Sequence, residues 1–385
     1  MESLVTRSSI KAGAALLARS VDFSLPAPHP DMRACVVVPA RNEETTLPAL
    51  IAALADQRDL QGIALHPDSY EVILLLNNCT DRTAAVGAAL RAQYPRHHLH
   101  LVEISFPPEH AHVGKARQAL FDTAFARLLT LDKSNGLILT TDADSRPMPE
   151  WIAQTEAEMN DGVAGVGGRI CLDPMEVATL PAGVRRFLLL DIGYRRALEE
   201  LRSLYAPESH DPFPRHHQHF GGSLAVTAAA YGAAGGMPLH RSNEDVALYR
   251  AIVDSGGRFR HSYAVRVVTS ARMIGRAQGG LADALEWWDE QARGSLPVFV
   301  ESAAAAEARL AELGLWCAAN LGAIPPSYLR LTPDQPLPEK RAEIHATLRE
   351  LRVICAALRP LPLATRLAAA RRRFAELPEM RESAA

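Results

Sequence analysis

Residues 136–151 read GLILTTDADSRPMPEW, and the organisation of the rest of the chain follows from this stretch. The apolar run at 137–139 predicts a short buried strand. The strand leads directly to Asp142 and Asp144, whose side chains can point the same way because alternate residues of an extended segment share a face. Ligands of open α/β sheets bind where the strands end. The stretch therefore predicts two carboxylates at the ligand-binding edge of a sheet.

Paired carboxylates are suitable ligands for Mg²⁺ or Mn²⁺, which are commonly shared between one or two protein carboxylates and the phosphates of a substrate. The alternative is a solvated loop in which Asp144 and Ser145 start a turn or cap the helix that begins after Pro147. For an isolated DxD pattern this alternative is the more frequent one. The motifs elsewhere in the chain reverse that preference.

The composition is that of an ordinary globular protein. The chain has 385 residues, of which 48% are hydrophobic and 22% charged, and its formal net charge is -3. This balance gives no electrostatic reason to expect nucleic acid as a partner. The five cysteines show no CxxC or metal-ligand spacing, and their odd number argues against a fully paired disulfide framework. We expect reduced thiols in a cytoplasmic protein.

The amino terminus, MESLVTRSSIKAGAALLARS, lacks an uninterrupted apolar core of signal-peptide length. No segment approaches the roughly 20 apolar residues of a membrane span. We therefore expect no integral membrane segment. An amphipathic contact that makes the protein peripheral to a membrane is a weaker alternative to a simple leading helix.

Strand and helix patterns alternate along the first 150 residues. Apolar runs predict buried strands, and segments with apolar residues at helical spacing follow each of them. The expected strands are 33–39, 71–76, 99–104 and 137–139, and the expected helices are 47–57, 82–93 and 115–131. Such alternation implies a parallel sheet with right-handed crossovers. A further strand is expected at 266–269, and helices from about residue 281 onward.

Five motifs in order carry a resemblance to a known family. VVVPARNEETTLPALIAALADQ (36–57), LLLNNCTDRTAAV (74–86), GKARQAL (114–120) and TTDADSRPMPEW (140–151) resemble the nucleotide-binding half of family 2 glycosyltransferases with the GT-A fold. HFGGSLAVTAAAYGAAGGMPLHRSNEDVALYRAIVDSGGRF (219–259) is similar to the acceptor half of that family. The matches cover roughly residues 33–280. DxD alone is a weak signal, whereas five motifs in family order are a strong one.

The resemblance implies a fold and a division of the chain. The fold is a GT-A type α/β domain, with a Rossmann-like, mostly parallel sheet flanked by helices, followed by a helical carboxyl-terminal extension. We expect a leader and linker at 1–30, the catalytic domain at 31–280 and the helical extension at 281–385. The catalytic domain would consist of a nucleotide-binding half, 31–150, and an acceptor half, 151–280.

The implied activity is that of a metal-dependent, hexosyltransferase-type enzyme that moves a sugar from a nucleotide-sugar donor to an acceptor hydroxyl. By resemblance Asp144 is the direct ligand of Mg²⁺ or Mn²⁺, and Asp142 acts through water, the metal or the ribose. The ion would neutralise charge that develops on the leaving diphosphate. We expect the donor to be bound by Pro39, Ala40, Arg41, Glu43, Asn77, Asp81, Lys115, Arg117, Asp142, Ala143, Gly222, Arg272 and Arg276.

Asn77 stands where the family usually has an aspartate that contacts the base, and Leu76 replaces a frequent neighbouring acid. An amide both donates and accepts hydrogen bonds, so uracil and guanine both remain possible. The alternative for NNCTD is an Asx turn in which Asp81 satisfies backbone donors. Lys115 and Arg117 open a helix that can attract phosphate, or they are simply solvated.

The usual family histidine is not present at Thr269 or Ser270, and we expect Arg272 and Arg276 to bind diphosphate with their planar guanidinium groups instead. His216, His217 and His219 lack paired helical spacing. They predict a loop that acts as a lid or faces the acceptor, rather than a zinc site.

The catalytic candidate is Asp245, because an acceptor hydroxyl needs a positioned carboxylate to take its proton during an inverting transfer. Glu244 would shape the site or contact acceptor hydroxyls. Both residues start a predicted helix, so the alternative role of Asp245 is an interaction with the helix dipole. Their position after GGSLAV and AAGGMP, in family order, favours catalysis.

Three other functions compete with this one. The first is a retaining transferase that acts on a small acid or polyol, in which Asp245 is not a base. The second is a nucleotidyltransferase, which would have a glycine- and arginine-rich loop after the first strand, unlike PARNEET. The third is a non-catalytic nucleotide-sugar sensor. The sequence does not distinguish between a sugar, another small molecule and a lipid-linked compound as the acceptor.

Overall fold

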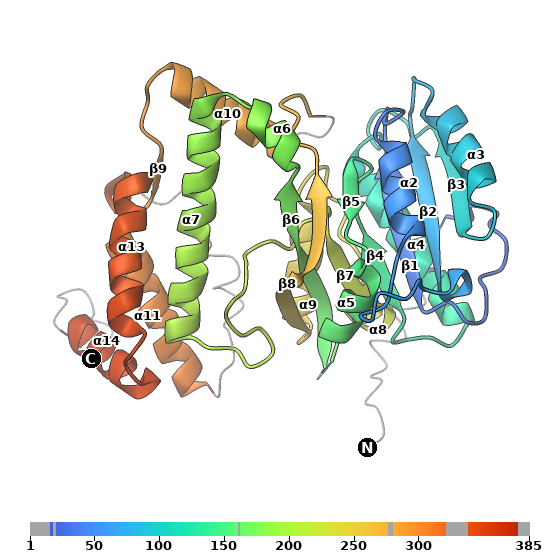
Figure 1. Ribbon diagram of the computed structural model, residues 1–385. Helices are drawn as coiled ribbons and strands as arrows, with labels where there is room; N and C mark the ends of the chain where they lie inside the picture. Colours follow the sequence, from blue (N-terminus) through green and yellow to red (C-terminus); the bar gives the residue numbers. More distant parts are fainter. Residues whose placement is uncertain (1–15, 18–20, 161, 276–279, 321–337, 376–385) are drawn as a thin grey trace. The chain divides into compact units, whose positions relative to one another are not determined.

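The computed structural model describes residues 16–17, 21–160, 162–275, 280–320 and 338–375 (Figure 1). The chain forms two compact units. The first contains the described residues up to Thr179 together with Gln218–Ala284, and the second contains Leu180–His217 and the described residues from Leu285 onward.

The first unit is built on an eight-stranded sheet with the order β3-β2-β1-β4-β7-β6-β8-β5. Its strands are β1 (Ala34–Ala40), β2 (Tyr70–Asn77), β3 (His98–Ile104), β4 (Leu137–Thr140), β5 (Ser145–Pro147), β6 (Val163–Leu172), β7 (Leu224–Thr227) and β8 (Arg258–Thr269). The pairs β1–β2, β2–β3, β1–β4 and β6–β8 are parallel. β7 is antiparallel to β4 and β6, and β5 is antiparallel to β8.

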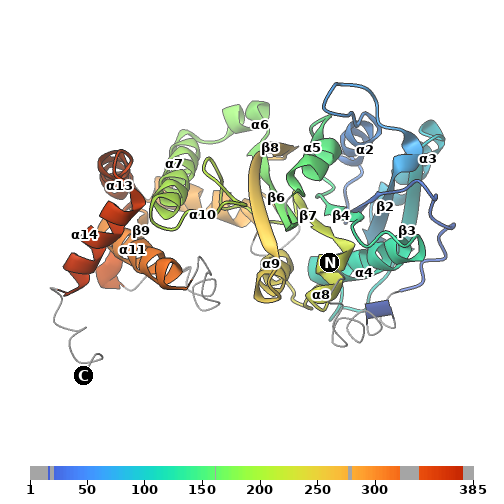
Figure 2. The same cartoon turned by 90° about the horizontal axis from the view of Figure 1, so that it is seen from below.

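Helices cover both faces of this sheet. On one side lie α2 (Leu47–Ala55), α3 (Thr83–Gln93) and α5 (Trp151–Glu158), and on the other lie α4 (Val113–Thr130), α8 (Ala228–Ala233) and α9 (Glu244–Asp254) (Figure 2). The short helices η1 (Pro67–Ser69) and α6 (Pro174–Thr179) complete the unit. β1, β2 and β4 are buried along their length because both faces are covered, which explains their continuous apolar sequences.

The predicted fold class is confirmed: the chain has a mostly parallel α/β sheet flanked by helices, followed by carboxyl-terminal helices. The predicted βα units of the first 150 residues are present, with ends displaced by a few residues. β8 is longer than the predicted strand at 266–269. β6 had not been predicted, and its glycines, Gly165, Gly167 and Gly168, weaken the sequence signal of a strand.

A buried ion pair ties β2 to α4. The Arg127 guanidinium donates from Nε and Nη2 to the two carboxylate oxygens of Glu71 at 2.6 and 2.5 Å. His100 lies 3.2 Å from the same carboxylate. Burial would raise the pKa of Glu71, but the hydrogen bonds of Arg127 and His100 outweigh it and lower that pKa to about 2. The carboxylate is therefore charged in the folded protein at neutral pH.

The second unit is helical. It contains α7 (Ala182–Tyr205), most of α10 (Leu281–Arg293), α11 (Ala303–Ala319), α13 (Ile344–Leu358) and α14 (Leu363–Ala375). A two-stranded ribbon of β9 (Phe299–Glu301) and β10 (Arg341–Glu343) and the turn η2 (Pro338–Lys340) accompany them. Arg215 is fully buried among Glu199, Glu208 and Asp211, and this cluster holds the loop that carries His216 and His217.

Within the described ranges, no helix combines the length and the apolar character needed to cross a lipid bilayer. The five cysteines are free thiols, and two of them, Cys35 and Cys355, are buried.

Candidate active site

The acidic pair lies at the carboxyl end of β4, next to the antiparallel pair β5–β8. The Thr141 hydroxyl donates to the carbonyl oxygen of Gly222 at 2.9 Å, which joins this strand end to the segment before β7. The hydroxyl of Thr269, at the end of β8, donates to Asp144 Oδ1 at 3.3 Å. Asp142 and Asp144 therefore lie where strand ends from both halves of the sheet meet.

Arg117, from the second turn of α4, joins Asp142 to the start of α9. Its Nη2 donates to Asp142 Oδ1 at 2.7 Å, and its Nη1 pairs with the carboxylate of Glu244. The side chains of Arg117 and Glu244 are almost completely buried, whereas that of Asp142 is 43% exposed. Asp142 can therefore still reach a ligand, while Arg117 is fixed between two carboxylates.

A second arginine, Arg272, follows β8 and binds the other aspartate. Its guanidinium donates to both carboxylate oxygens of Glu43, at 3.1 and 2.9 Å, and lies 2.8 Å from Asp144 Oδ2. Burial and the nearby Asp142 raise the pKa of Asp144 to about 6, against the lowering effect of Arg272. Each aspartate of the DxD motif is thus paired with its own arginine.

Asp245 is placed by backbone donors. Its Oδ2 accepts a hydrogen bond from the Gly221 N–H at 2.6 Å, and its Oδ1 accepts one from the Val246 N–H at 2.7 Å. Although the side chain of Asp142 is 43% exposed, desolvation by the surrounding protein raises its pKa, Arg117 lowers this pKa, and the negative charge of Asp245 raises it further. Asp142 and Asp245, more than 100 residues apart in the sequence, therefore lie within electrostatic range of each other.

Glycines make this close approach possible. A Cβ at Gly221 would lie 2.3 Å from Cζ of Arg117, and a Cβ at Gly222 would lie 3.1 Å from Asp142 Oδ2. Gly114, at the start of α4, lies against the backbone of residue 240, because a Cβ there would meet the His240 carbonyl oxygen at 1.7 Å. The family motif indicated both Gly221 and Gly222, but the contact between Gly221 and Arg117 is visible only in the structure.

Gln218 and two glycines of β6 fix the segment that leads to Gly221, and the sequence analysis missed them. The Ile170 N–H donates to Gln218 Oε1 at 2.9 Å, and Gln218 Nε2 donates to the Ile170 carbonyl oxygen at 3.3 Å. A Cβ at Gly167 would meet the Gln218 carbonyl oxygen at 2.3 Å, and one at Gly168 would meet Ser223 Oγ at 2.2 Å. The sequence VGGR did not by itself predict that the segment at 218–223 lies against these glycines.

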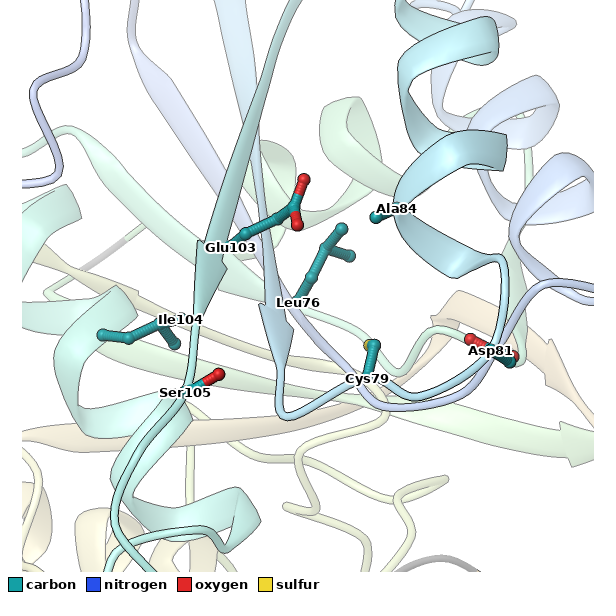
Figure 3. A pocket seen from close by; sticks show the side chains of 7 residues that line it. All are labelled: Leu76, Cys79, Asp81, Ala84, Glu103, Ile104 and Ser105. Atoms are coloured by element: carbon teal, nitrogen blue, oxygen red, sulfur yellow. The ribbon is translucent and has the colours of Figure 1, made fainter.

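A pocket lies at the ends of β2 and β3, beside the start of α3 (Figure 3). Its lining residues are Leu76, Cys79, Asp81, Ala84, Glu103, Ile104 and Ser105. Asp81 accepts hydrogen bonds from the Thr83 and Glu44 N–H groups at 2.9 and 3.3 Å, as the Asx-turn alternative requires.

Asn77 is buried, and in the described part of the chain no hydrogen-bond partner satisfies its Oδ1. Its amide is therefore the better candidate for a ligand contact.

The other predicted donor-binding residues lie at strand and helix ends. Pro39 and Ala40 end β1, and Ala143 separates the two aspartates. Arg41 is exposed and donates to the Ala111 carbonyl oxygen at 3.3 Å, while Lys115, in the first turn of α4, donates to Gln118 Oε1 at 3.1 Å. Arg276 lies outside the described residues.

The carboxylates that are present fit a divalent cation. Asp142 and Asp144 offer hard oxygen ligands, and the missing side chain at Gly222 leaves space beside Asp142 Oδ2. Among the described residues, no group of three or more histidine, cysteine, aspartate or glutamate side chains is arranged to hold a metal ion. A cation would therefore take two carboxylates from the protein and complete its coordination with water and substrate oxygens.

Comparison with known families relates part of the chain to one of them. Residues 35–204 match the family described as glycosyl transferase family 2. Over these residues, a little under half of its length, the chain carries a family 2 glycosyltransferase domain. The matched region includes the DxD motif and Arg117, and it ends inside α7. Glu244, Asp245 and Arg272 of this glycosyltransferase lie beyond it, so their association with the domain rests on the structure.

Comparison with curated proteins gives no match. Among solved structures, the glycosyltransferase is similar to the mannosyltransferase PcManGT from Pyrobaculum calidifontis in complex with GDP-Man and Mn²⁺, with 18% identity, a TM-score of 0.45, and coverage of 97% of this chain and 91% of that chain. It is also similar to S. aureus TarS 1-349 in complex with UDP-GlcNAc, with 14% identity, a TM-score of 0.44, and coverage of 77% and 69%. Glucosyl-3-phosphoglycerate synthase from Mycobacterium tuberculosis shares 16% identity, with a TM-score of 0.36 and coverage of 77% and 87%.

Proposed function

We propose that this glycosyltransferase moves a sugar from a nucleotide-sugar donor to an acceptor hydroxyl in a metal-dependent reaction with inversion at the anomeric carbon. The observation that carries the proposal is the meeting of Asp142, from the donor half, with Asp245, from the acceptor half. Arg117 donates to Asp142, the Gly221 N–H donates to Asp245, and Arg117 and Gly221 lie against each other. A donor held at Asp142 would thus place its sugar close to the carboxylate of Asp245.

Asp144 and Asp142 would hold Mg²⁺ or Mn²⁺, and the ion would supply Lewis-acid stabilisation of the leaving diphosphate. The nucleoside would lie along the ends of β1 and β2, against Pro39, Ala40 and Asn77. The unsatisfied Oδ1 of Asn77 supports this placement, because a buried amide oxygen gains from a donor on the base. Lys115, Arg41 and Arg272 would face the phosphates.

Asp245 would act as the general base. As the acceptor oxygen attacks the anomeric carbon and the bond from that carbon to the diphosphate oxygen breaks, the hydroxyl proton would pass to a carboxylate oxygen of Asp245. The Gly221 N–H orients this carboxylate through Oδ2, and the half-buried position of Asp245 leaves it open to an acceptor. Glu244 is paired with Arg117 and would shape the site rather than accept the proton.

The free cysteines are compatible with the reducing cytoplasm, and we propose that the enzyme acts there.

A binding experiment and a turnover experiment test this function together. Thermal shifts are measured with UDP, GDP and their sugars, each with and without Mn²⁺. We expect a metal-dependent shift with one nucleotide and its loss in Asp144→Ala. Equal shifts in that variant would remove Asp144 from the metal site.

With the donor so identified, Asp245→Asn is expected to bind it normally but to abolish transfer. Donor binding without turnover in the wild-type enzyme, across sugar, polyol and lipid-linked acceptors, would instead favour a sensor. NMR of the product's anomeric proton distinguishes inversion from retention. A retained configuration would exclude Asp245 as the base of a single displacement.

A further inference from the structure

Two arginines neutralise the acidic pair. Arg117 bridges Asp142 and Glu244, and Arg272 bridges Asp144 and Glu43. Each arginine therefore connects one aspartate of the DxD motif to a glutamate of another segment. A cation that binds both aspartates must approach two guanidinium groups that already carry positive charge.

The two arginines differ in their freedom to move. The side chain of Arg117 is 5% exposed, lies against the backbone of Gly221 and comes from the interior of an 18-residue helix. The side chain of Arg272 is 28% exposed and comes from an irregular segment after β8. Its backbone is tied down upstream, where Glu176 accepts hydrogen bonds from the Ser270 hydroxyl and the Ala271 N–H. The guanidinium of Arg272 can therefore leave Asp144 while its backbone stays in place.

The partner of Arg272 on the other side is held firmly. Glu43 is buried, its N–H donates to Thr83 Oγ1 at 2.8 Å, and its Oε2 accepts from the Thr46 hydroxyl at 2.6 Å. Glu43 thus fixes one edge of the guanidinium beside Asp144. The positive charge of Arg272 is built into the site and does not belong to a solvated surface arginine.

We propose that Arg272 is an exchangeable counter-ion of Asp144: it occupies this carboxylate in the free enzyme and passes to the donor diphosphate when the divalent cation takes its place. This inference rests on the proposed function, because it assigns the cation to Asp144. A guanidinium and a divalent cation that share one carboxylate repel each other strongly in a partly buried site. A diphosphate relieves the repulsion, since its oxygens match the planar fork of an arginine.

The exchange couples the two ligands. A cation that binds without nucleotide has to displace Arg272 from Asp144. Glu43 is then the only carboxylate that still neutralises the Arg272 guanidinium, so we expect the cation alone to bind weakly. The nucleotide provides the new partner for Arg272, so it strengthens cation binding, and the cation strengthens nucleotide binding by the same factor. The free enzyme would accordingly favour the nucleotide–metal pair over either ligand alone.

Binding of Mn²⁺ alone to the full chain tests the exchange without any turnover. Free Mn²⁺ is measured by electron paramagnetic resonance during titration of wild type, R272Q, R272K and R309Q, and then again with saturating UDP or GDP. R309Q is the matched control, because Arg309 makes a similar half-buried, two-pronged pair with Glu301 in the helical unit. Urea unfolding checks that each variant is folded.

We expect R272Q to bind Mn²⁺ alone at least about tenfold more tightly than wild type, because the competing charge is gone. R272K keeps the charge and should stay within about threefold of wild type, and R309Q should not differ from it. The nucleotide should increase Mn²⁺ affinity less in R272Q than in wild type. Mn²⁺ binding that is unchanged or weaker in R272Q, or equally tightened in R272K, would overturn the exchange.

The outcome is separable from that of the proposed function. D144N should abolish Mn²⁺ binding in the wild-type and R272Q backgrounds alike. If D144N binds Mn²⁺ normally, the metal role of Asp144 fails and the exchange fails with it. If D144N loses the metal but R272Q behaves as wild type, the metal site stands and the exchange alone is refuted.

Discussion

The contact between Gly221 and Arg117 gives the sharpest prediction about the site. In Gly221→Ala the new Cβ would lie 2.3 Å from Cζ and 2.4 and 2.5 Å from the two terminal nitrogens of Arg117. All three atoms belong to a rigid planar group that is buried and held by Asp142 and Glu244. The guanidinium has to move, and both ion pairs move or break with it.

The cost can be estimated from its two parts. Overpacking of a well-packed interior costs about 1–3 kcal/mol. Disruption of a buried ion pair that leaves a carboxylate unpaired costs about 3–5 kcal/mol. The exposed side chain of Asp142 recovers hydration, whereas that of Glu244 does not, so the two parts together predict a loss of about 4 kcal/mol or more in the free energy of unfolding.

A double-mutant cycle in urea isolates the contact. Gly221→Ala, Arg117→Ala and the double variant are unfolded in parallel. Gly87→Ala serves as a control, because its new Cβ meets the flexible ends of two side chains, Leu101 at 3.3 and 3.4 Å and Leu47 at 3.7 Å. Arg117→Ala should lose about 3–5 kcal/mol on its own. On that background Gly221→Ala should cost less than about 0.5 kcal/mol, because the three atoms nearest to the new Cβ all belong to the Arg117 guanidinium.

Additive costs would refute the reasoning. They would mean that the methyl group at Gly221 acts on the backbone alone and that Arg117 does not lie against it. The N–H of Gly221 also holds Asp245, so we expect turnover in Gly221→Ala to fall more than donor binding does.

Four further predictions follow from other contacts. The pKa of Glu71 is lowered to about 2, from 4.5 for the unfolded chain, so this carboxylate contributes about 3 kcal/mol to the free energy of unfolding. The contribution is complete above about pH 4.5 and is lost as the pH falls toward 2. In Glu71→Gln the urea midpoint should therefore fall less steeply with decreasing pH than in wild type. Asp144 has a pKa raised to about 6, from 3.8, so the metal-free protein should lose stability as the pH rises from about 4 to 6, and Asp144→Asn should flatten this slope. Gly114→Ala places a Cβ 1.7 Å from the His240 carbonyl oxygen and should cost about 3 kcal/mol or more by urea unfolding, whereas a loss below about 1 kcal/mol would contradict this close approach. Gln218→Ala leaves the Ile170 N–H without its acceptor and should cost about 1–3 kcal/mol, with a fall in kcat as the support of Gly221 loosens; an unchanged kcat would argue against that support.

The sequence predicted those parts of the fold that depend on local pattern. Continuous apolar runs gave β1, β2 and β4, because a strand buried on both faces needs apolar residues at every position. Helical spacing gave α2, α3, α4 and α9. The motif order also placed Asp142, Asp144, Glu244 and Asp245 at the ends of elements, where side chains can reach a ligand.

The sequence did not predict the elements whose local signal is weak or ambiguous. β6 is rich in glycine because the segment at Gln218 lies directly on it, so its stability comes from pairing with β7 and β8. α7, although it lies within the predicted 31–280 domain, belongs to the second unit, and nothing in its amphipathic pattern states which core it joins. The predicted domain limits remain predictions.

The roles of the arginines show where sequence reasoning ends. GKARQAL and SARMIGRAQGG mark Arg117 and Arg272 as cations near the ends of elements, and an arginine in such a place is predicted to face phosphate. Only the tertiary structure decides that Arg117 is buried between Asp142 and Glu244 and that Arg272 rests between Asp144 and Glu43. The choice of partner is a competition among all charges that folding brings together, and the distances that settle it are set by strand order and by glycines such as Gly221. The one-dimensional pattern thus determined which side chains reach the edge of the sheet, and the packing of the sheet determined which of them meet.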